Sequence, residues 1–116
     1  MEKKEIIEDV KTLQIYFYDA KIKHDELTKA GFTRNPFAGT FKSYGSVLVQ
    51  LVEYIGYDSS NELFLYAVQV IDGKNDFYIL SQPSEYLKAR ELYVKARAVC
   101  ALGLHLYMYD VGDIDD

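Results

Sequence analysis

The clearest hydrophobic pattern of the chain lies between Asn61 and Ser81, where two runs of β-branched and aromatic residues flank a turn at residues 72–75. Such runs on either side of an Asp-Gly turn are typical of a β-hairpin. Along residues 63–71 both sets of alternate positions are apolar apart from Gln69. Since a strand with one face in water alternates apolar and polar side chains, this strand is predicted to lie inside a sheet that is covered on both faces.

Residues 46–57 are rich in valine and lead into a second turn, which predicts a further strand. The short connections make neighbouring strands antiparallel, so residues 46–81 are predicted to form a β-meander. A helix ending at Gly56 is the alternative for residues 46–56, because periodicity does not separate the two structures in a short apolar run. The expected strands are residues 46–57, 62–72 and 76–81.

Two helices are predicted to cover this meander, and the first precedes it. From Ile6 onward the apolar positions are spaced alternately by four and three residues, and Gly31 suits the left-handed position after a helix. We therefore expect one helix over residues 2–30. The alternative is a strand over residues 13–17, which would break the helix near Asp19.

The second helix is predicted over residues 83–101, because Pro83 and Glu85 follow a serine and are typical of a helix start. Residues 104–111 alternate with the period of a strand and form a possible last strand. Residues 112–116 are an acidic tail.

Residues 32–45 contain an Asn-Pro pair and two glycines, which predicts a loop or a short edge strand. Arg34 and Phe37 lie in this segment, where an arginine and an aromatic ring could contact an anion and a base or peptide side chain. The whole chain, residues 1–116, is thus predicted to be one α+β domain. Its antiparallel meander of three to five strands is covered by an N-terminal and a C-terminal helix.

The composition restricts the class of protein. No apolar run approaches the roughly 18 residues of a membrane span, and the N-terminus lacks a signal-peptide core, so we expect a cytoplasmic protein that does not contact the membrane. Cys100 is the only cysteine, which excludes an internal disulfide and a cysteine-based zinc site. We expect neither a metal nor a cofactor.

The net charge of −5 is distributed unevenly, with +1 on residues 1–42, −4 on residues 43–82 and −2 on residues 83–116. An acidic sheet region repels phosphate backbones, which argues against broad nucleic-acid binding, whereas it suits a basic protein partner. Eleven tyrosines and no tryptophan also suit a contact surface, although tyrosine is equally common in strands and cores.

Arg90 and Arg97 are the unusual feature of the predicted second helix. When residues 84–101 are projected at roughly 100° per residue, both arginines fall between two apolar flanks and beside Tyr86 and Tyr93. A buried arginine requires an anionic partner because desolvation of an unpaired ion is costly. The first flank contains Tyr86, Ala89, Tyr93, Ala96 and Cys100, and the second contains Leu87, Val94, Ala98 and Ala101.

Three partners for these arginines remain open. The first is a carboxylate of the same chain, such as Asp76 or Glu62. The second is a carboxylate of another copy across a homo-oligomer interface, which the small residues of the helix would permit. The third is an anionic small molecule, because arginine forks bind phosphate and tyrosine rings stack on bases.

The leading functional hypothesis is a small cytoplasmic binding protein that acts through protein contact, as an inhibitor, immunity or accessory factor of the kind that mobile elements encode. The alternative is a binder of an anionic, nucleotide-like ligand. The candidate ligand or interface residues are Arg90, Arg97, Tyr86, Tyr93, Arg34 and Phe37. We do not expect the protein to be an enzyme, since no catalytic motif is present. His24 lies on an apolar helix face and is interpreted as a packed residue.

Overall fold

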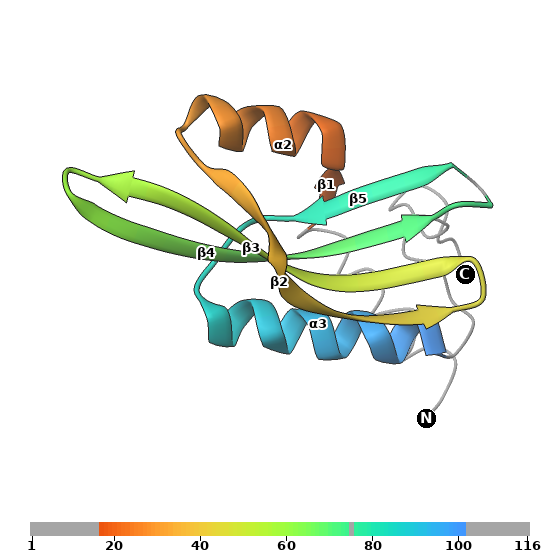
Figure 1. Cartoon of the computed structure of the whole chain (residues 1–116). Helices are drawn as coiled ribbons and strands as arrows, with labels where there is room; N and C mark the ends of the chain where they lie inside the picture. Colours follow the sequence, from red (N-terminus) through yellow and green to blue (C-terminus); the bar gives the residue numbers. More distant parts are fainter. Residues whose placement is uncertain (1–16, 75, 102–116) are drawn as a thin grey trace, which may run out of the picture.

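Five strands and two helices make up the described part of the chain, residues 17–74 and 76–101 of a computed structural model (Figure 1). The strands form one antiparallel sheet in the order β1-β5-β4-β3-β2. The predicted α+β fold with a helix on each side is confirmed. The elements are β1 (Phe17–Asp19), α2 (Ala20–Lys29), β2 (Thr33–Tyr44), β3 (Val47–Asp58), β4 (Asn61–Asp72), β5 (Phe77–Ser81) and α3 (Tyr86–Ala101).

Strand β4 is the centre of the sheet, as its apolar pattern predicts. It pairs with β3 along its whole length, from Asn61 opposite Asp58 to Asp72 opposite Val47, and with β5 through residues 69–72. Residues 47–56 are therefore strand and not helix, and Ser46 lies in the preceding turn. Residues 67–70 of β4 are buried, but residues 61–64 are exposed, so the prediction of burial on both faces holds only for the second half of β4.

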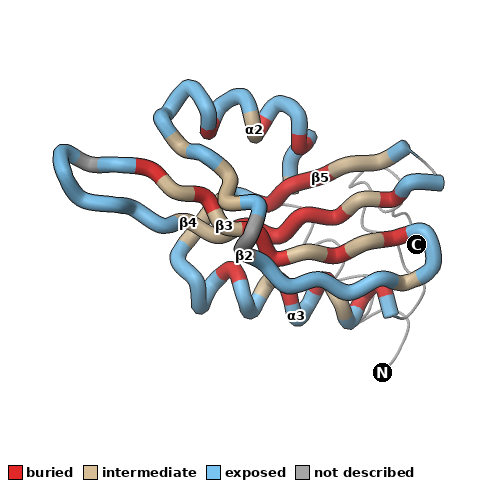
Figure 2. Tube along the Cα trace, in the orientation of Figure 1, coloured by how far each residue is buried: buried red, intermediate tan, exposed pale blue. Residues whose placement is uncertain are grey.

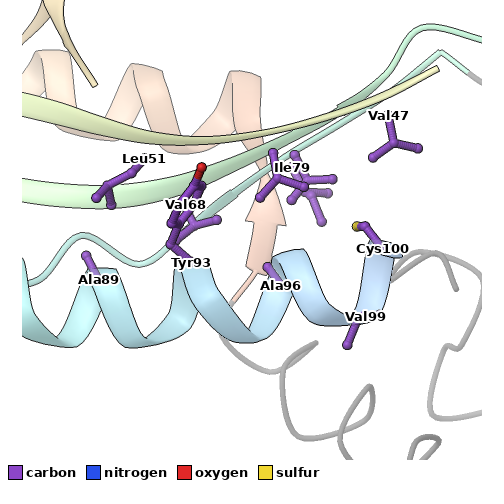
Figure 3. Packing of buried hydrophobic residues seen from close by; sticks show 11 residues of the cluster. Val47, Leu51, Val68, Ile79, Ala89, Tyr93, Ala96, Val99 and Cys100 are labelled. Atoms are coloured by element: carbon purple, nitrogen blue, oxygen red, sulfur yellow. The ribbon is translucent and has the colours of Figure 1, made fainter. Parts of the chain in front are cut away.

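The two helices cover opposite faces of the sheet (Figures 1 and 2). Because side chains alternate along a strand, Leu51 and Val68 point to α3, whereas Val52 and Ala67 point to α2. Figure 3 shows the hydrophobic cluster on the α3 face, in which side chains of the sheet meet Ala89, Tyr93 and Ala96 of α3. Two apolar layers thus enclose the sheet.

The prediction of one helix over residues 2–30 is wrong at residues 17–19, and its part before Phe17 lies outside the described residues. Phe17–Asp19 form strand β1, which pairs with β5, so the alternative that breaks the helix near Asp19 is correct there. Asp19 caps α2, since its Oδ1 accepts hydrogen bonds from the backbone N–H groups of Lys21 and Ile22 at 3.0 and 3.2 Å. Gly31 follows the helix with φ +92°, as predicted.

Residues 33–44 form β2, a longer edge strand than the predicted loop or short strand. A bulge between Asn35 and Thr40 shifts its register against β3 and absorbs the irregular residues. Gly39, with φ +132°, lies in this bulge, and a Cβ atom there would stand 2.6 Å from the carbonyl oxygen of Leu51. The glycine therefore permits the close approach of the two strands.

Helix α3 begins at Tyr86 and not at residue 83. The residues before it serve another purpose, because Ser84 exchanges two backbone hydrogen bonds with Tyr66 of β4, at 2.8 and 2.9 Å. The segment that was predicted to be the first helical turn instead fixes the start of α3 beneath the sheet. The possible strand over residues 104–111 and the tail over residues 112–116 lie outside the described residues.

Candidate functional site

Arg97 is half-buried on α3 and contacts aromatic side chains. Its Nε donates a hydrogen bond to the Tyr44 hydroxyl at 3.2 Å, and its guanidinium lies 5.5 Å from the centre of the Tyr93 ring. The hydrogen bond with Tyr44 is the main cause that raises the pKa of Arg97 above its ordinary value. Arg97 and Tyr93 are therefore neighbours, as predicted. The hydrogen-bond partner of Arg97 is the Tyr44 hydroxyl and not one of the predicted anionic groups.

Arg90 is exposed on the outer side of α3. The second apolar flank of the helix is exposed as well, with Leu87 at 68% and Val94 at 55%, so only the first flank packs on the sheet. Among the described residues the ion pair is Lys23–Glu26, and neither helix arginine is paired with Asp76 or Glu62. The prediction that both arginines lie on a packed face is therefore wrong for Arg90, which is exposed, whereas Arg97 is half-buried.

The six predicted site residues do not form one site. Tyr86 contacts Tyr66 of β4, with ring centres 5.2 Å apart in an edge-to-face arrangement. Arg34 lies in β2 opposite Tyr54, on the face of the sheet that α2 covers, and thus on the other side from Arg90 and Arg97. Phe37 is in β2, but its side chain lies outside what the structure describes.

A network of six polar side chains on the α2 face was not predicted, apart from Arg34. Arg34 donates from Nη1 to Gln69 Oε1 at 3.1 Å and from Nη2 to Gln50 Oε1 at 3.3 Å. Gln69 Nε2 donates to Gln50 Oε1 at 3.1 Å, and the Tyr78 hydroxyl donates to Gln69 Oε1 at 2.5 Å. The network therefore joins β2, β3, β4 and β5, and its remaining members are His24 and Tyr54.

The hydrogen bonds determine which nitrogen of His24 carries the proton. Because the Tyr78 hydroxyl donates to Gln69, its oxygen is left to accept from His24 Nε2 at 2.9 Å. His24 Nδ1 then accepts from the Tyr54 hydroxyl at 2.6 Å. His24 is thus neutral with the proton on Nε2, and it fastens α2 to two strands, as the packed interpretation predicts.

Burial and the charge of Arg34 set the protonation of this network. Burial lowers the pKa of His24, Arg34 lowers it further, and Asp25 acts in the opposite direction. Burial raises the pKa of Tyr54 to about 12 and also raises that of Tyr78, although Arg34 opposes both shifts. Near neutral pH the network therefore contains one cation, Arg34, surrounded by neutral groups.

The second unusual surface is the outer end of the β3–β4 hairpin, which reaches past both helices (Figure 1). Its exposed aromatic residues include Tyr57 at 68% and Phe64 at 45%. Tyr57 pairs in register with Glu62, and Phe64 with Ile55, so these side chains point to the α3 side of the sheet. We call the following residues the arm surface: Tyr57, Phe64, Tyr66 and Tyr86.

The described side chains include no group of three His, Cys, Asp or Glu residues that could hold a metal ion. Neither α2 nor α3 is long and apolar enough to cross a membrane.

Comparisons of the chain with protein-family models, curated proteins and solved structures found no match. We therefore infer function from the geometry of these surfaces.

Proposed function

We propose that the protein is a small binding protein that docks a basic protein partner on the arm surface. The observation that carries this proposal is the aromatic arm surface, which includes rings at the projecting end of the β3–β4 hairpin and at the start of α3. The outer end of the hairpin is largely exposed (Figure 2). Tyr57 and Phe64 are exposed there, although a folded protein normally covers such large rings or uses them for binding. Tyrosine and phenylalanine are enriched at the centres of protein interfaces, because they bury much apolar area with few rotatable bonds.

Polar groups around the arm surface indicate the charge of the partner. Glu53 is held by Tyr66, which donates to Oε2 at 2.8 Å, and by Asn35, which donates to Oε1 at 3.0 Å. Glu62 and Glu85 are both exposed; Glu62 pairs in register with Tyr57, and Glu85 directly precedes Tyr86. Three carboxylates near an aromatic surface are complementary to a partner that presents basic side chains around an apolar centre.

The preorganised position of Glu53 supports this proposal further. Two donors keep both of its oxygens in place, so an arriving basic side chain does not need to order the carboxylate. The edge-to-face contact between Tyr66 and Tyr86 fixes the base of the arm surface in the same way. An inhibitor, immunity or accessory role, a cytoplasmic location and the absence of catalysis remain predictions from the sequence.

Site-specific photo-crosslinking in the native host tests the proposal. A photoreactive phenylalanine analogue at position 64 should capture a partner, whereas the same analogue at position 41 should not. Phe41 is the matched control, because it is more exposed than Phe64 but lies on the α2 face, opposite Gln50. Equal capture from both positions would contradict the proposal.

The captured partner is then identified, purified and titrated by calorimetry. Phe64→Ala and Tyr57→Ala should each raise the Kd by about tenfold or more, as expected at the centre of an interface. Phe41→Ala should leave the Kd unchanged. Added salt should weaken binding if the carboxylates meet basic groups. An unchanged Kd in both arm variants would overturn the proposal.

A different observation supports the predicted homo-oligomer, and we propose a second contact on the outer side of α3. Leu87 and Val94 are exposed two helical turns apart, with Ala98 and Ala101 on the same stripe. Leu87, Arg90, Glu91, Val94 and Lys95 line a shallow, open depression. A second copy of α3 fits this stripe, because small and aliphatic side chains allow close helix packing.

A further inference from the structure

Arg34 is a partly buried cation for which the described residues supply no carboxylate. The described ion pair is between Lys23 and Glu26, whereas Arg34 is held by the amide oxygens of Gln50 and Gln69. Burying a charge is costly, and neutral amides offset only part of that cost. Within the described residues, the centre of the α2 face therefore carries a positive charge that no carboxylate pairs, in a protein whose net charge is −5.

The contacts of Arg34 orient its guanidinium without using all of its donors. A guanidinium has five N–H groups in one plane, and the hydrogen bonds to Gln69 and Gln50 come from Nη1 and Nη2. Gln69 in turn is fixed by the Tyr78 hydroxyl and by Gln50. A planar fork that is held in place with donors left over is the arrangement that recognises phosphate and carboxylate groups.

The neighbouring groups favour an anion as well. Beside His24, Arg34 lowers the pKa of the imidazole more than Asp25 raises it, so the positive charge of Arg34 has the larger effect there. His24 is neutral, and Tyr54 and Tyr78 stay protonated, so no described member of the network opposes an incoming anion.

We propose that Arg34, Gln50 and Gln69 form a binding site for a small molecule that carries a phosphate or carboxylate group. An exposed ring lies next to this site, since Phe41 is 64% exposed and pairs in register with Gln50. The ring provides a surface on which an apolar or aromatic part of the ligand packs. The site is separate from the arm surface, because it lies on the opposite face of the sheet.

Calorimetric titration of the full chain with three probes tests this inference. Inorganic phosphate, a nucleoside 5′-monophosphate and benzoate distinguish a bare oxyanion, a phosphate ester with a ring, and a carboxylate with a ring. At least one probe should bind saturably below about 10 mM, a concentration that largely fills a site with a Kd near 1 mM. No saturable binding of any probe would overturn the inference.

Arg34→Gln should raise the Kd of the bound probe by about tenfold or more, because it removes the cation. Lys88→Gln is the matched control, since it removes one positive charge from an exposed side chain of α3, on the other side of the sheet, and it should leave the Kd unchanged. An equal loss in both variants would reduce the effect to net charge and overturn the site.

Gln50→Glu keeps the test decisive if Arg34→Gln fails to fold. This substitution places a carboxylate 3.3 Å from Arg34 Nη2, where it competes with the ligand for the same guanidinium. The variant should fold, and its Kd for the probe should rise by a similar factor. Retained binding in a folded Gln50→Glu protein would contradict the inference. Capture of a protein partner by the arm surface is unaffected by either variant, so the two proposals fail independently.

Discussion

His24 shows how one residue links the protonation of a side chain to the docking of a helix. The folded state holds His24 neutral and lowers its pKa below the ordinary value near 6.5, chiefly through burial. As the pH falls below about 6.5, the unfolded chain therefore binds a proton that the folded chain does not. The contribution of His24 to stability is complete above that pH and is lost as the pH drops through the folded-state pKa.

Urea unfolding between pH 5.5 and 7.5 checks this prediction. The wild-type protein should lose more stability on acidification than His24→Gln, which keeps a polar side chain but does not titrate. Four groups face or flank His24, and both proteins keep all of them: Arg34, Tyr54, Tyr78 and Asp25. The difference between the two stability curves therefore reports the titration of His24. Parallel stability curves for the two proteins would show that His24 does not titrate differently on folding.

Cys100 is a second residue whose environment controls its chemistry. Burial, followed by the negative charge of Asp72, raises the pKa of its thiol to about 11. At pH 8 only about one thiol in a thousand is then ionised, and the thiolate is the reactive form. We expect a thiol reagent to label native Cys100 far more slowly than the urea-unfolded chain. Similar rates in the two states would place Cys100 at an accessible position.

At the scale of elements, β4 combines a structural half and an exposed half. Val68 is fully buried between the sheet and α3, whereas Phe64 in the same strand is 45% exposed. Val68→Ala should therefore lower the free energy of unfolding by roughly 1 to 4 kcal/mol, through lost burial and a cavity. Phe64→Ala should cost no more than about 0.5 kcal/mol. Equal losses in chemical denaturation would mean that the arm belongs to the core.

The bulge in β2 gives a prediction about backbone conformation. Gly39→Ala should destabilise the protein by roughly 1 to 3 kcal/mol, because the positive φ is strained for alanine. The new Cβ would also stand 2.6 Å from the Leu51 carbonyl oxygen. Gly73→Ala is the control, since a Cβ there meets nothing within 4 Å. A thermal-unfolding comparison in which both variants match the wild type would contradict this account of the bulge.

The spacing of apolar residues predicted most of the elements correctly, wherever a segment keeps a single helical or strand period. The meander over residues 46–81 and the helix over residues 86–101 follow from such patterns, which require only neighbouring residues. The start of α2 was missed because Phe17 fits both a helical and an alternating pattern, and only pairing with β5 separates the two. The length of β2 was missed because its bulge hides the alternation.

At the scale of the whole molecule, the polar network could not be predicted from spacing. Tyr78 lies 54 residues after His24, and Gln69 lies 35 residues after Arg34. The sheet order brings these residues together across four strands and a helix. The glutamines that hold Arg34 have no distinctive local pattern. By contrast, Arg97 and Tyr93 were predicted as neighbours, because they lie one turn apart on one helix.

Self-association through α3 is the last prediction and concerns the whole molecule. In a parallel two-fold pair of helices, Leu87 and Val94 of one copy meet the same residues of the other. Arg90 and Glu91 flank the stripe on opposite sides, so this symmetry brings Arg90 of each copy beside Glu91 of the other. An antiparallel pair would instead place like charges together, so charge complementarity favours the parallel arrangement.

Light scattering should therefore show a dimer at tens of micromolar protein, a concentration range in which a micromolar Kd leaves mostly dimer. Val94→Asp should give the 13.4 kDa monomer. Arg90→Glu and Glu91→Arg should each weaken the dimer because like charges then meet, and combining them should restore it. A wild-type protein that stays monomeric at this concentration would reject self-association. A dimer that Val94→Asp leaves intact would place the contact elsewhere, and failure of the charge exchange to restore the dimer would reject the parallel arrangement.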